Sequence, residues 1–407
     1  MPVIPYPRPP RGPLREISDR LELGMLSADS ARELCALGLD WKIVAPHVHD
    51  IDWWRDQPIN LCAPAKQHWN VNAWDATLRL ATSETILWID PGPSAPFPSL
   101  PPELVVITHA HADHTDRLEE WVRSFPEMRI VMTPLTAQIL SLRFYASGAF
   151  RKILDRTIQV EFNERRTISG ISLQFLPAGH LLGAAMLELE FGIDRILVTG
   201  DFAMREVGGL PGAQIPTGDY AFMVMEATEC SKKSLPFADL QSTRAPFLRE
   251  VLEQVGADRH VIRINTYSLG EAQEAYATLV MAQQAGAFPE FSVCLDGLAA
   301  SVSNLYSKEL AHQSSAWKKD FLKPADYFST NSLVISPIQG QINTAPGANI
   351  IERPTLFMHA GWAEKMAFAV NISCHQVYFY HGFSTSLDIA LNELGRKTSA
   401  PTKDVAL

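Results

Sequence analysis

The most constraining feature of this chain is the run of residues 108–116, which reads Thr-His-Ala-His-Ala-Asp-His-Thr-Asp. Within six positions it places four side chains that can bind a metal ion, namely His109, His111, Asp113 and His114. The apolar run 104–107 comes directly before it and predicts a buried strand. A strand that ends in a short loop can direct alternate imidazoles to one point, and imidazole with carboxylate suits zinc or a similar divalent ion. The chain is therefore expected to fold around a metal site at a strand end.

Three more candidate ligands follow along the chain, each at the end of an apolar, strand-like segment. They are His180, Asp201 and His381. A glycine stands next to each of them in the sequence. Glycine lets the backbone turn sharply and approach a bound ion closely. We therefore predict that these three residues join the same centre.

The seven residues resemble the motif set of the metallo-β-lactamase fold, which is His-x-His-x-Asp-His followed by a lone His, a lone Asp and a final His. The resemblance implies two metal ions, of which one would be held by His109, His111 and His180. The other would be held by Asp113, His114 and His381. Asp201 would bridge the two ions. The implied cofactors are two zinc ions, with manganese as an alternative, and their shared hydroxide is the expected nucleophile.

Three further segments resemble the β-CASP branch of this fold, the group that processes nucleic acids. Residues 224–228 resemble its Glu-Ser-Thr motif and contain Glu226. Residues 265–274 resemble the start of its inserted cap domain. Residues 358–362, Met-His-Ala-Gly-Trp, resemble its Ser-Ala-His-Ala-Asp-Trp signature and contain His359. The resemblance covers the chain from about residue 72 onward.

The chain departs from the family pattern at three positions that are not expected ligands. Glu271 stands where the cap domain usually has arginine, so an acid replaces a cation that could face a phosphate. Gly361 replaces the aspartate that usually follows His-Ala, and Asp116 stands where a small residue is common. These departures bear on substrate contacts rather than on metal binding.

Segments between about 231 and 354 alternate between helical and strand-like patterns, which predicts an α/β layer with a parallel sheet. Because His381 must return to the metal centre, this block is expected to be an insertion. The expected fold class is α/β: a metallo-β-lactamase αββα sandwich with an inserted α/β β-CASP cap domain. The expected domains are an N-terminal extension without an assigned role at 1–71, the first part of the metallo-β-lactamase domain at 72–230, the cap at 231–354 and the last part of the metallo-β-lactamase domain at 355–407.

Composition restricts the class of protein and its location. With 407 residues, 46% of them hydrophobic and 20% charged, the chain is an ordinary globular protein. It has no apolar stretch that could span a bilayer and no apolar core of a signal peptide near its start. Its five scattered cysteines form no Cys-x-x-Cys pair. We therefore expect a cytoplasmic protein without a membrane partner, and a homodimer is left open.

The net charge of −10 argues mildly against a typical basic nucleic-acid-binding protein. It does not exclude a nuclease, because two divalent ions would offset part of the carboxylate charge near the site. The candidates for a basic groove, chosen by their proximity to the motifs, are Arg117, Arg123, Arg205, Lys232 and Lys233. An ordinary role as solvated surface cations is at least as well supported for each of them.

The resemblance implies a metal-dependent hydrolase, a phosphodiesterase that cleaves single-stranded nucleic acid. His381 at the last motif goes with RNA-processing members, but segment 107–114 also resembles bacterial exonucleases associated with DNA ligases. RNA is therefore only slightly favoured over DNA. The predicted catalytic residues are Asp113, His359 and Glu226. His359 is a candidate general acid or a substrate-positioning residue, and Glu226 is expected to orient a metal ligand or His359.

Two other functional classes remain open. A small-molecule ester or thioester hydrolase of the same fold would use the same ligands, although it normally lacks the cap and His359. A non-catalytic subunit of a nucleic-acid-processing complex would usually have lost ligands, whereas this chain keeps all seven.

Overall fold

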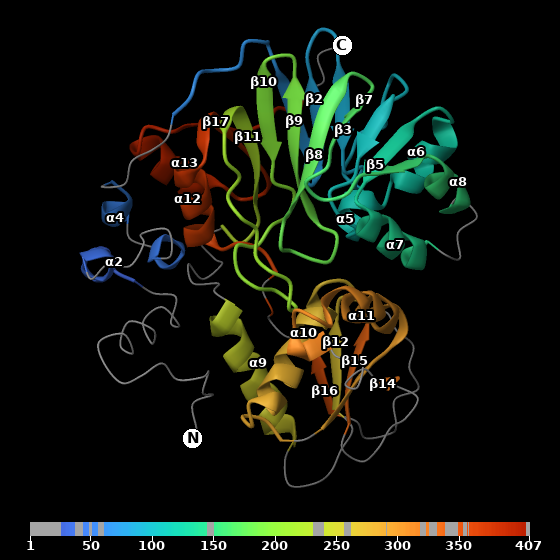
Figure 1. The fold of residues 1–407 in the computed structure, drawn as a ribbon, viewed down its shortest axis with the longest axis vertical. Helices are drawn as coiled ribbons and strands as arrows, with labels where there is room; N and C mark the ends of the chain where they lie inside the picture. Colours follow the sequence, from blue (N-terminus) through green and yellow to red (C-terminus); the bar gives the residue numbers. More distant parts are fainter. Residues whose placement is uncertain are drawn as a thin grey trace. The chain divides into compact units, whose positions relative to one another are not determined.

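The computed structural model describes residues 26–36, 44–48, 51–55, 61–144, 150–230, 240–255, 262–289, 291–317, 323–324, 332–337, 349–352, 356 and 358–403. The chain divides into two compact units, which are coloured by sequence in Figure 1. The larger unit contains Met25–Arg205, Gly212–Ala238 and His359–Leu407. The described part of the smaller unit lies within Glu206–Pro211 and Asp239–Met358.

The larger unit is built on two sheets. The first sheet has its strands in sequence order, β1 (Asn70–Trp74), β2 (Thr77–Ala81), β3 (Ile86–Ile89), β4 (Leu104–Val106), β5 (Arg129–Met132) and β6 (Thr157–Gln159). Strands β1 to β3 are antiparallel neighbours. From β3 to β6 the strands run parallel. Parallel neighbours place successive carboxyl ends at one edge of the sheet, and the segment that follows β4 carries the first predicted ligands.

The second sheet has the strand order β18-β17-β11-β10-β9-β8-β7. Its strands are β7 (Arg165–Ile168), β8 (Ile171–Pro177), β9 (Ala185–Phe191), β10 (Asp194–Val198), β11 (Asp219–Ala227), β17 (Ser373–Gly382) and β18 (Lys397–Ser399). Strands β7 to β10 pair antiparallel, and β10, β11, β17 and β18 pair parallel. Strand β17 therefore brings the C-terminal part of the chain back beside β11, as an inserted domain requires.

The core of the larger unit lies between the two sheets. Alternate residues of each strand point to the same face, so Leu78 and Leu80 of β2 join Leu187 and Leu189 of β9 in one buried cluster. In Figure 1, α12 (Trp362–Asn371) and α13 (Thr385–Glu393) lie on one side of the paired sheets. On the other side lie α5 (Ala112–Thr115), α6 (Leu118–Ser124), α7 (Pro134–Arg143) and α8 (Phe150–Asp155). The αββα sandwich expected from the sequence is confirmed.

Among the described residues before the first sheet are three short helices, α2 (Ala28–Ala36), η1 (Ala45–His47) and α4 (Ile51–Arg55). Trp53 and Trp54 of α4 are buried, and Trp54 Nε1 donates a hydrogen bond to the carbonyl of Val48 at 2.9 Å. Helix η1 packs against α12. These described residues of the region 1–71 therefore belong to the larger unit. Nowhere in the described ranges is a helix both long and apolar enough to cross a bilayer.

The smaller unit contains a parallel five-stranded sheet with the order β14-β13-β15-β12-β16. Its elements are α9 (Leu240–Val255), β12 (Ile262–Thr266), α10 (Glu271–Gln284), β13 (Ser292–Leu295), α11 (Gly297–Leu310), η2 (Ser315–Trp317), β14 (Lys323–Pro324), β15 (Ser332–Pro337) and β16 (Asn349–Glu352). Segment Glu206–Pro211 joins this unit, because Gly208 N donates to Glu274 Oε2 at 2.6 Å and Trp317 Nε1 donates to Gly208 O at 2.7 Å. The inserted α/β layer is thus present.

Truncation of Leu187 to alanine should test the core between the two sheets. Leu187 is fully buried, so Leu187→Ala removes apolar contacts and leaves a cavity. We expect the free energy of unfolding of the larger unit to fall by about 2–5 kcal/mol. Ile193, which is 75% exposed between β9 and β10, is the matched control, and Ile193→Ala should change it by at most about 0.5 kcal/mol. Urea denaturation of the full chain measures both, and equal losses would contradict this assignment of the core.

Candidate metal centre

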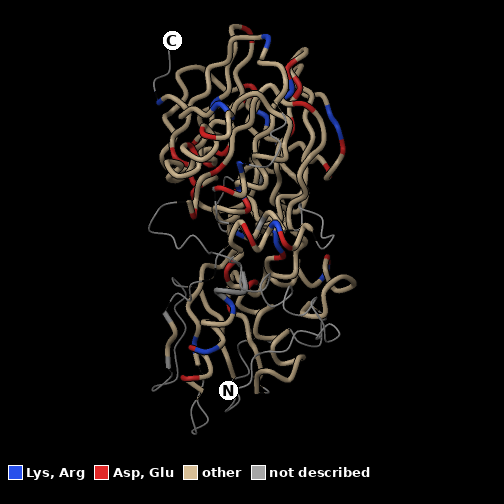
Figure 2. Tube along the Cα trace, turned by 90° about the vertical axis from the view of Figure 1, so that its left-hand side faces the viewer, with Lys and Arg blue, Asp and Glu red and all other residues tan. Residues whose placement is uncertain are grey.

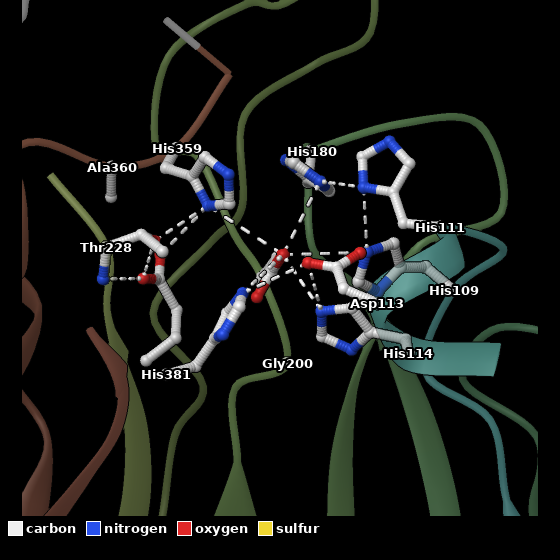
Figure 3. A network of polar contacts seen from close by, with 12 residues as sticks. His109, His111, Asp113, His114, His180, Gly200, Thr228, His359, Ala360 and His381 are labelled. Atoms are coloured by element: carbon white, nitrogen blue, oxygen red, sulfur yellow. Dashed lines mark hydrogen bonds and ion pairs between the residues drawn. The ribbon is translucent and has the colours of Figure 1, made fainter. Parts of the chain in front are cut away.

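The structure brings the seven predicted ligands together, and Figure 3 shows six of them by label around one point. They come from both sheets of the sandwich. His109 follows β4, His111 directly precedes α5, and Asp113 and His114 lie in α5. His180 follows β8, Asp201 follows β10, and His381 is the second-last residue of β17. Their function as metal ligands stays a prediction, and the short distances between their ligand atoms support it.

The first group contains His109, His111, His180 and Asp201, each of which offers a ligand atom within 4.8 Å of the others. The Nδ1 atom of His111 lies 3.1 Å from Nε2 of His109 and 3.1 Å from Nε2 of His180. Burial lowers the pKa of His109 well below its ordinary value and lowers that of His111 to about 3. Both imidazoles are therefore neutral at physiological pH, which is the form that binds a metal.

The second group contains Asp113, His114 and His381, which also offer atoms within 4.8 Å of one another. Asp113 Oδ2 lies 3.9 Å from His114 Nε2 and 3.5 Å from His381 Nε2. Burial opposes the charged form of both histidines, but nearby carboxylates, with Asp201 first among them, raise the pKa of each above its ordinary value. In the metal-free chain these two rings therefore hold protons that a metal has to displace.

Asp201 lies between the two groups. Its Oδ2 is 3.5 Å from His109 Nε2 and 3.2 Å from His114 Nε2. It is also 3.8 Å from His180 Nε2 and 3.8 Å from His381 Nε2. Burial opposes ionisation of this carboxyl, but the surrounding histidines outweigh burial and hold the pKa of Asp201 well below its ordinary value. An ionised carboxylate in contact with both groups has the position of a bridging ligand.

One unpaired atom shows that the residues fit a divalent metal. Asp201 Oδ1 is buried and makes no hydrogen bond of acceptable geometry within the described part of the chain. An unsatisfied buried polar atom costs roughly 1–3 kcal/mol, more for a charged group, unless a ligand meets it. A carboxylate oxygen is a common metal ligand. Metal binding would therefore remove the penalty carried by this atom.

Two carboxylates that sequence reasoning missed hold the rings of the second group. Asp90, at the end of β3, is fully buried and lies 2.9 Å by Oδ2 from His114 Nδ1. It also accepts hydrogen bonds from the amide and hydroxyl of Thr108 at 2.7 and 2.6 Å. Asp75, in the turn between β1 and β2, lies 2.8 Å by Oδ1 from His381 Nδ1. Such carboxylates fix the tautomer and orientation of a ligating ring. The available signal was an Asp-Pro-Gly sequence directly after a predicted strand.

Two glycines allow the segments around the centre to pack closely. A Cβ atom on Gly92 would lie 1.8 Å from the carbonyl oxygen of Asp113, so the turn after β3 can pass under α5 only as glycine. Gly382 has a φ of +139°, and its Cβ would lie 2.3 Å from the carbonyl oxygen of Ala227. These contacts set the backbone positions of the ligand segments on both sheets.

His359 lies beside the centre, immediately before α12, and Figure 3 shows it near His180 and Thr228. Its Nδ1 is 2.9 Å from Thr228 Oγ1, 3.6 Å from Glu226 Oε1 and 3.9 Å from Asp201 Oδ2. Glu226 is fully buried, and its Oε2 accepts a hydrogen bond from Thr228 N at 2.8 Å. Because these partners gather at Nδ1, Nε2 is the ring atom that could exchange a proton with a substrate. The contacts agree with the predicted role of Glu226 in orienting His359.

The three candidate basic residues that the structure describes are each paired with an acid. Arg117 pairs with Glu120, Arg123 with Glu119 and Arg205 with Glu364. Each arginine therefore meets an acidic side chain of its own unit. Lys232 and Lys233 lie outside the described residues.

Comparison with known proteins gives the family. Residues 82–235 match the model of the metallo-beta-lactamase superfamily. This segment contains the ligand candidates from His109 to Asp201, and the inserted α/β unit and the His359 segment follow it. Residues 82–235 of the chain thus form a metallo-β-lactamase segment, and the chain is similar to proteins named as ribonucleases and as cleavage and polyadenylation factor subunits.

Three named relatives agree with this assignment. A ribonuclease of Thermus thermophilus is 27% identical over 276 residues, which are 63% of this chain and 62% of that protein. Cleavage and polyadenylation specificity factor subunit 3-I of Arabidopsis thaliana is 25% identical over 42% of this chain and 27% of its own length. A transcription termination factor of Methanosarcina mazei is 25% identical over 50% of this chain and 34% of its own. The match therefore spans less than two thirds of the length of each of these relatives.

A solved structure titled as a protein of unknown function from Enterococcus faecalis V583 shares the fold. Its TM-score is 0.53 at 13% identity, and the match covers 84% of this chain and 99% of that chain. At this identity the likeness concerns the fold alone.

Replacement of Asp90 by asparagine should weaken metal binding by this protein. Asp90→Asn removes the negative charge that faces His114 and the two donors of Thr108. We expect the affinity for zinc to fall by about 10–100-fold. Competition with a chromophoric chelator measures it. Asp29→Asn, at a position whose side chain is 95% exposed, is the control and should bind zinc like the unmodified chain. Unchanged affinity of the Asp90 variant would show that this contact does not support the ligand.

Metal binding should strengthen as the pH rises from about 6.5 to 8. The pKa values of His114 and His381 lie above the ordinary histidine value in the metal-free chain, so raising the pH removes the protons that compete with the metal. Each displaced proton contributes roughly a tenfold change in affinity per pH unit in the range where it is bound. Calorimetric titration with zinc in buffers of different ionisation enthalpy measures the released protons. Binding without proton release at pH 7 would contradict the raised pKa values.

Proposed function

We propose that this chain is a metal-dependent nuclease that hydrolyses phosphodiester bonds of single-stranded nucleic acid, with RNA slightly favoured over DNA. The observation that carries the proposal is the position of Asp201 Oδ2, which lies within 4 Å of imidazole nitrogens of both ligand groups. The names of the relatives support it, because they include a ribonuclease and a cleavage and polyadenylation factor subunit. RNA is preferred on the same ground.

The proposed cofactors are two zinc ions, with manganese as the alternative. His109, His111 and His180 would hold one ion, and Asp113, His114 and His381 the other, with Asp201 shared between them. When bound, two such ions provide an activated hydroxide nucleophile and neutralise charge on the phosphate oxygens. The chain itself keeps the ligand rings in place through Asp90 and Asp75.

The proposed role of His359 is protonation of the leaving oxygen. Thr228 and Glu226 engage Nδ1, which leaves Nε2 to face a substrate, and the side chain is 20% exposed. A residue that gives a proton to the leaving group has to be both held in place and accessible. His359 meets both conditions, whereas Glu226 is fully buried and acts through His359.

The distribution of charge favours recognition close to the metal centre over a broad basic surface. Figure 2 shows Lys and Arg positions interspersed with Asp and Glu positions along the described chain. The three described arginine candidates are each paired with an acid. We therefore propose that the bound metal ions provide much of the attraction for the phosphate backbone.

Cleavage of end-labelled single-stranded RNA and DNA of matched sequence tests the proposed function. Protein loaded with zinc or manganese should cut at least one polymer, and RNA faster. His109→Ala and Asp113→Ala each remove a ligand, so we expect cleavage to fall by more than about 100-fold. Ile193→Ala is the control with full activity. If loaded protein cuts neither polymer but hydrolyses small esters, the chain is a small-molecule hydrolase, and if it binds RNA without any hydrolysis it is a non-catalytic subunit.

A comparison of leaving groups separates the two roles open to His359. His359→Ala should reduce cleavage of a natural phosphodiester by about 10²–10⁴-fold, because the leaving alkoxide needs a proton. An aryl phosphodiester with a nitrophenolate leaving group needs no such proton, so its hydrolysis should fall far less. Steady-state kinetics on both substrates measures the difference. An equal loss on the two substrates would mean that His359 positions the substrate instead.

A further inference from the structure

Lys365 is a buried cation that the proposed mechanism does not use. It lies in α12, and its side chain is fully buried. Its Nζ lies 2.9 Å from Glu226 Oε1, and it donates to the carbonyl oxygens of Thr228 at 2.7 Å and Ala360 at 2.5 Å. A lysine is rarely fully buried, and burial of its charge is costly unless every proton finds an acceptor. The three acceptors match the three donors of an ammonium group.

Each of these three acceptors belongs to a residue that holds His359. Glu226 Oε1 and Thr228 Oγ1 lie 3.6 and 2.9 Å from Nδ1 of the His359 ring. Ala360 is the next residue in the chain. Lys365 therefore joins the end of β11, which carries the partners of the ring, to the backbone segment that carries the ring itself.

The charges around Lys365 favour a specific pair with Glu226. Cys230 is a second ionisable group close to the ammonium, and burial raises the pKa of its thiol to about 12, so it stays neutral. Glu364 is engaged by Arg205 and by the amide of Gly361. Burial opposes ionisation of Glu226, but Lys365 and His359 together outweigh burial and lower the pKa of that carboxyl. Glu226 is thus the carboxylate that balances Lys365.

Two other contacts near His359 hold its backbone, and the ring itself also lies against the His180 ring and 3.9 Å by Nδ1 from Asp201 Oδ2. Ala360 N donates to Phe202 O at 2.6 Å, and Arg205 Nη2 donates to His359 O at 3.0 Å. Neither of them reaches the side chains of Glu226 or Thr228. Lys365 contacts both the carbonyl of Ala360, beside His359 in the chain, and Glu226, which lies against the His359 ring. Through these contacts it links the backbone position of His359 to the orientation of its ring.

We propose that Lys365 is a positioning residue, whose buried ammonium sets the His359 ring toward the metal centre through Glu226 and Thr228. The inference rests on the proposed hydrolytic function for its kinetic test, but the ring orientation can be observed without catalysis. The chain offers a reason for the arrangement, since Gly361 supplies no side chain beside His359 and Lys365, one helical turn later, reaches back to the same segment.

Kinetics of three variants tests the proposal on the metal-loaded full chain. Lys365→Met removes the ammonium but keeps the length of the side chain, and Glu226→Gln removes its partner charge. We expect each to lower kcat by about 10–100-fold with KM and zinc content unchanged, because displacement of a catalytic group by about 1 Å can cost that much. If both act on His359 as one unit, the double variant should be no slower than the slower single variant. Lys152→Met, at an exposed position of α8, is the control.

The double variant also keeps the test valid if a single variant fails to fold. A buried lysine without its carboxylate, or the reverse, is strongly destabilising, whereas removal of both charges is tolerated far better. A folded, zinc-loaded double variant that recovers kcat to within twofold of the unmodified chain would overturn the proposal. Losses in the two single variants that multiply in the double variant would overturn it as well, because the residues would then act independently.

Histidine side-chain NMR separates this proposal from the proposed function. In zinc-loaded protein with ¹⁵N-labelled histidine, Lys365→Met should shift the ring resonances of His359, which are assigned with His359→Gln, and leave those of His109 in place. If the unmodified chain cleaves neither RNA nor DNA, the proposed function fails, but this shift still supports the positioning role. Unchanged His359 resonances in Lys365→Met would refute the positioning role even in an active nuclease.

Discussion

The whole centre depends on a buried negative charge at Asp201. This carboxylate is almost fully buried, and its Oδ2 touches imidazole nitrogens of both ligand groups. A buried carboxylate is stable only when positive charge or hydrogen-bond donors surround it. In the metal-free chain, protonated His114 and His381 supply that charge, and bound metal ions would supply it in their place. Protons and metal therefore compete for the same rings.

Three further carboxylates contact the ring nitrogens of His114, His381 and His359. Asp90 contacts His114, Asp75 contacts His381, and Glu226 with Thr228 contacts His359. Each of these acids lies at or near the end of a strand of the sandwich, where backbone geometry is rigid. Lys365 extends the arrangement, because it balances Glu226 and also holds the backbone beside His359. The acids that orient the rings are thus as much a part of the site as the ligands.

The sequence was sufficient to predict the seven clustered residues, because they leave local patterns, and the resemblance of these motifs to a known family implied the sandwich. Four of the ligands lie within six positions, and the others end apolar segments, so strand periodicity and residue type point to them directly. The inserted α/β unit was predicted from alternating segments for the same reason. Asp75 and Lys365 carry no comparable local signal. Asp75 is 306 positions from His381, and Lys365 is 137 positions from Thr228, so only folding makes them neighbours.

Residue type and strand-end position by themselves therefore determined which side chains could bind a metal, and the family resemblance of the motifs implied the fold that presents them. Tertiary structure decided the protonation and the orientation of those side chains. The pKa values of His111 and His114 move in opposite directions although the two residues are three positions apart, because burial dominates at one and carboxylates from distant strands dominate at the other. These effects on the pKa depend on distance in space and on exclusion of water, and a local sequence pattern predicts neither of them.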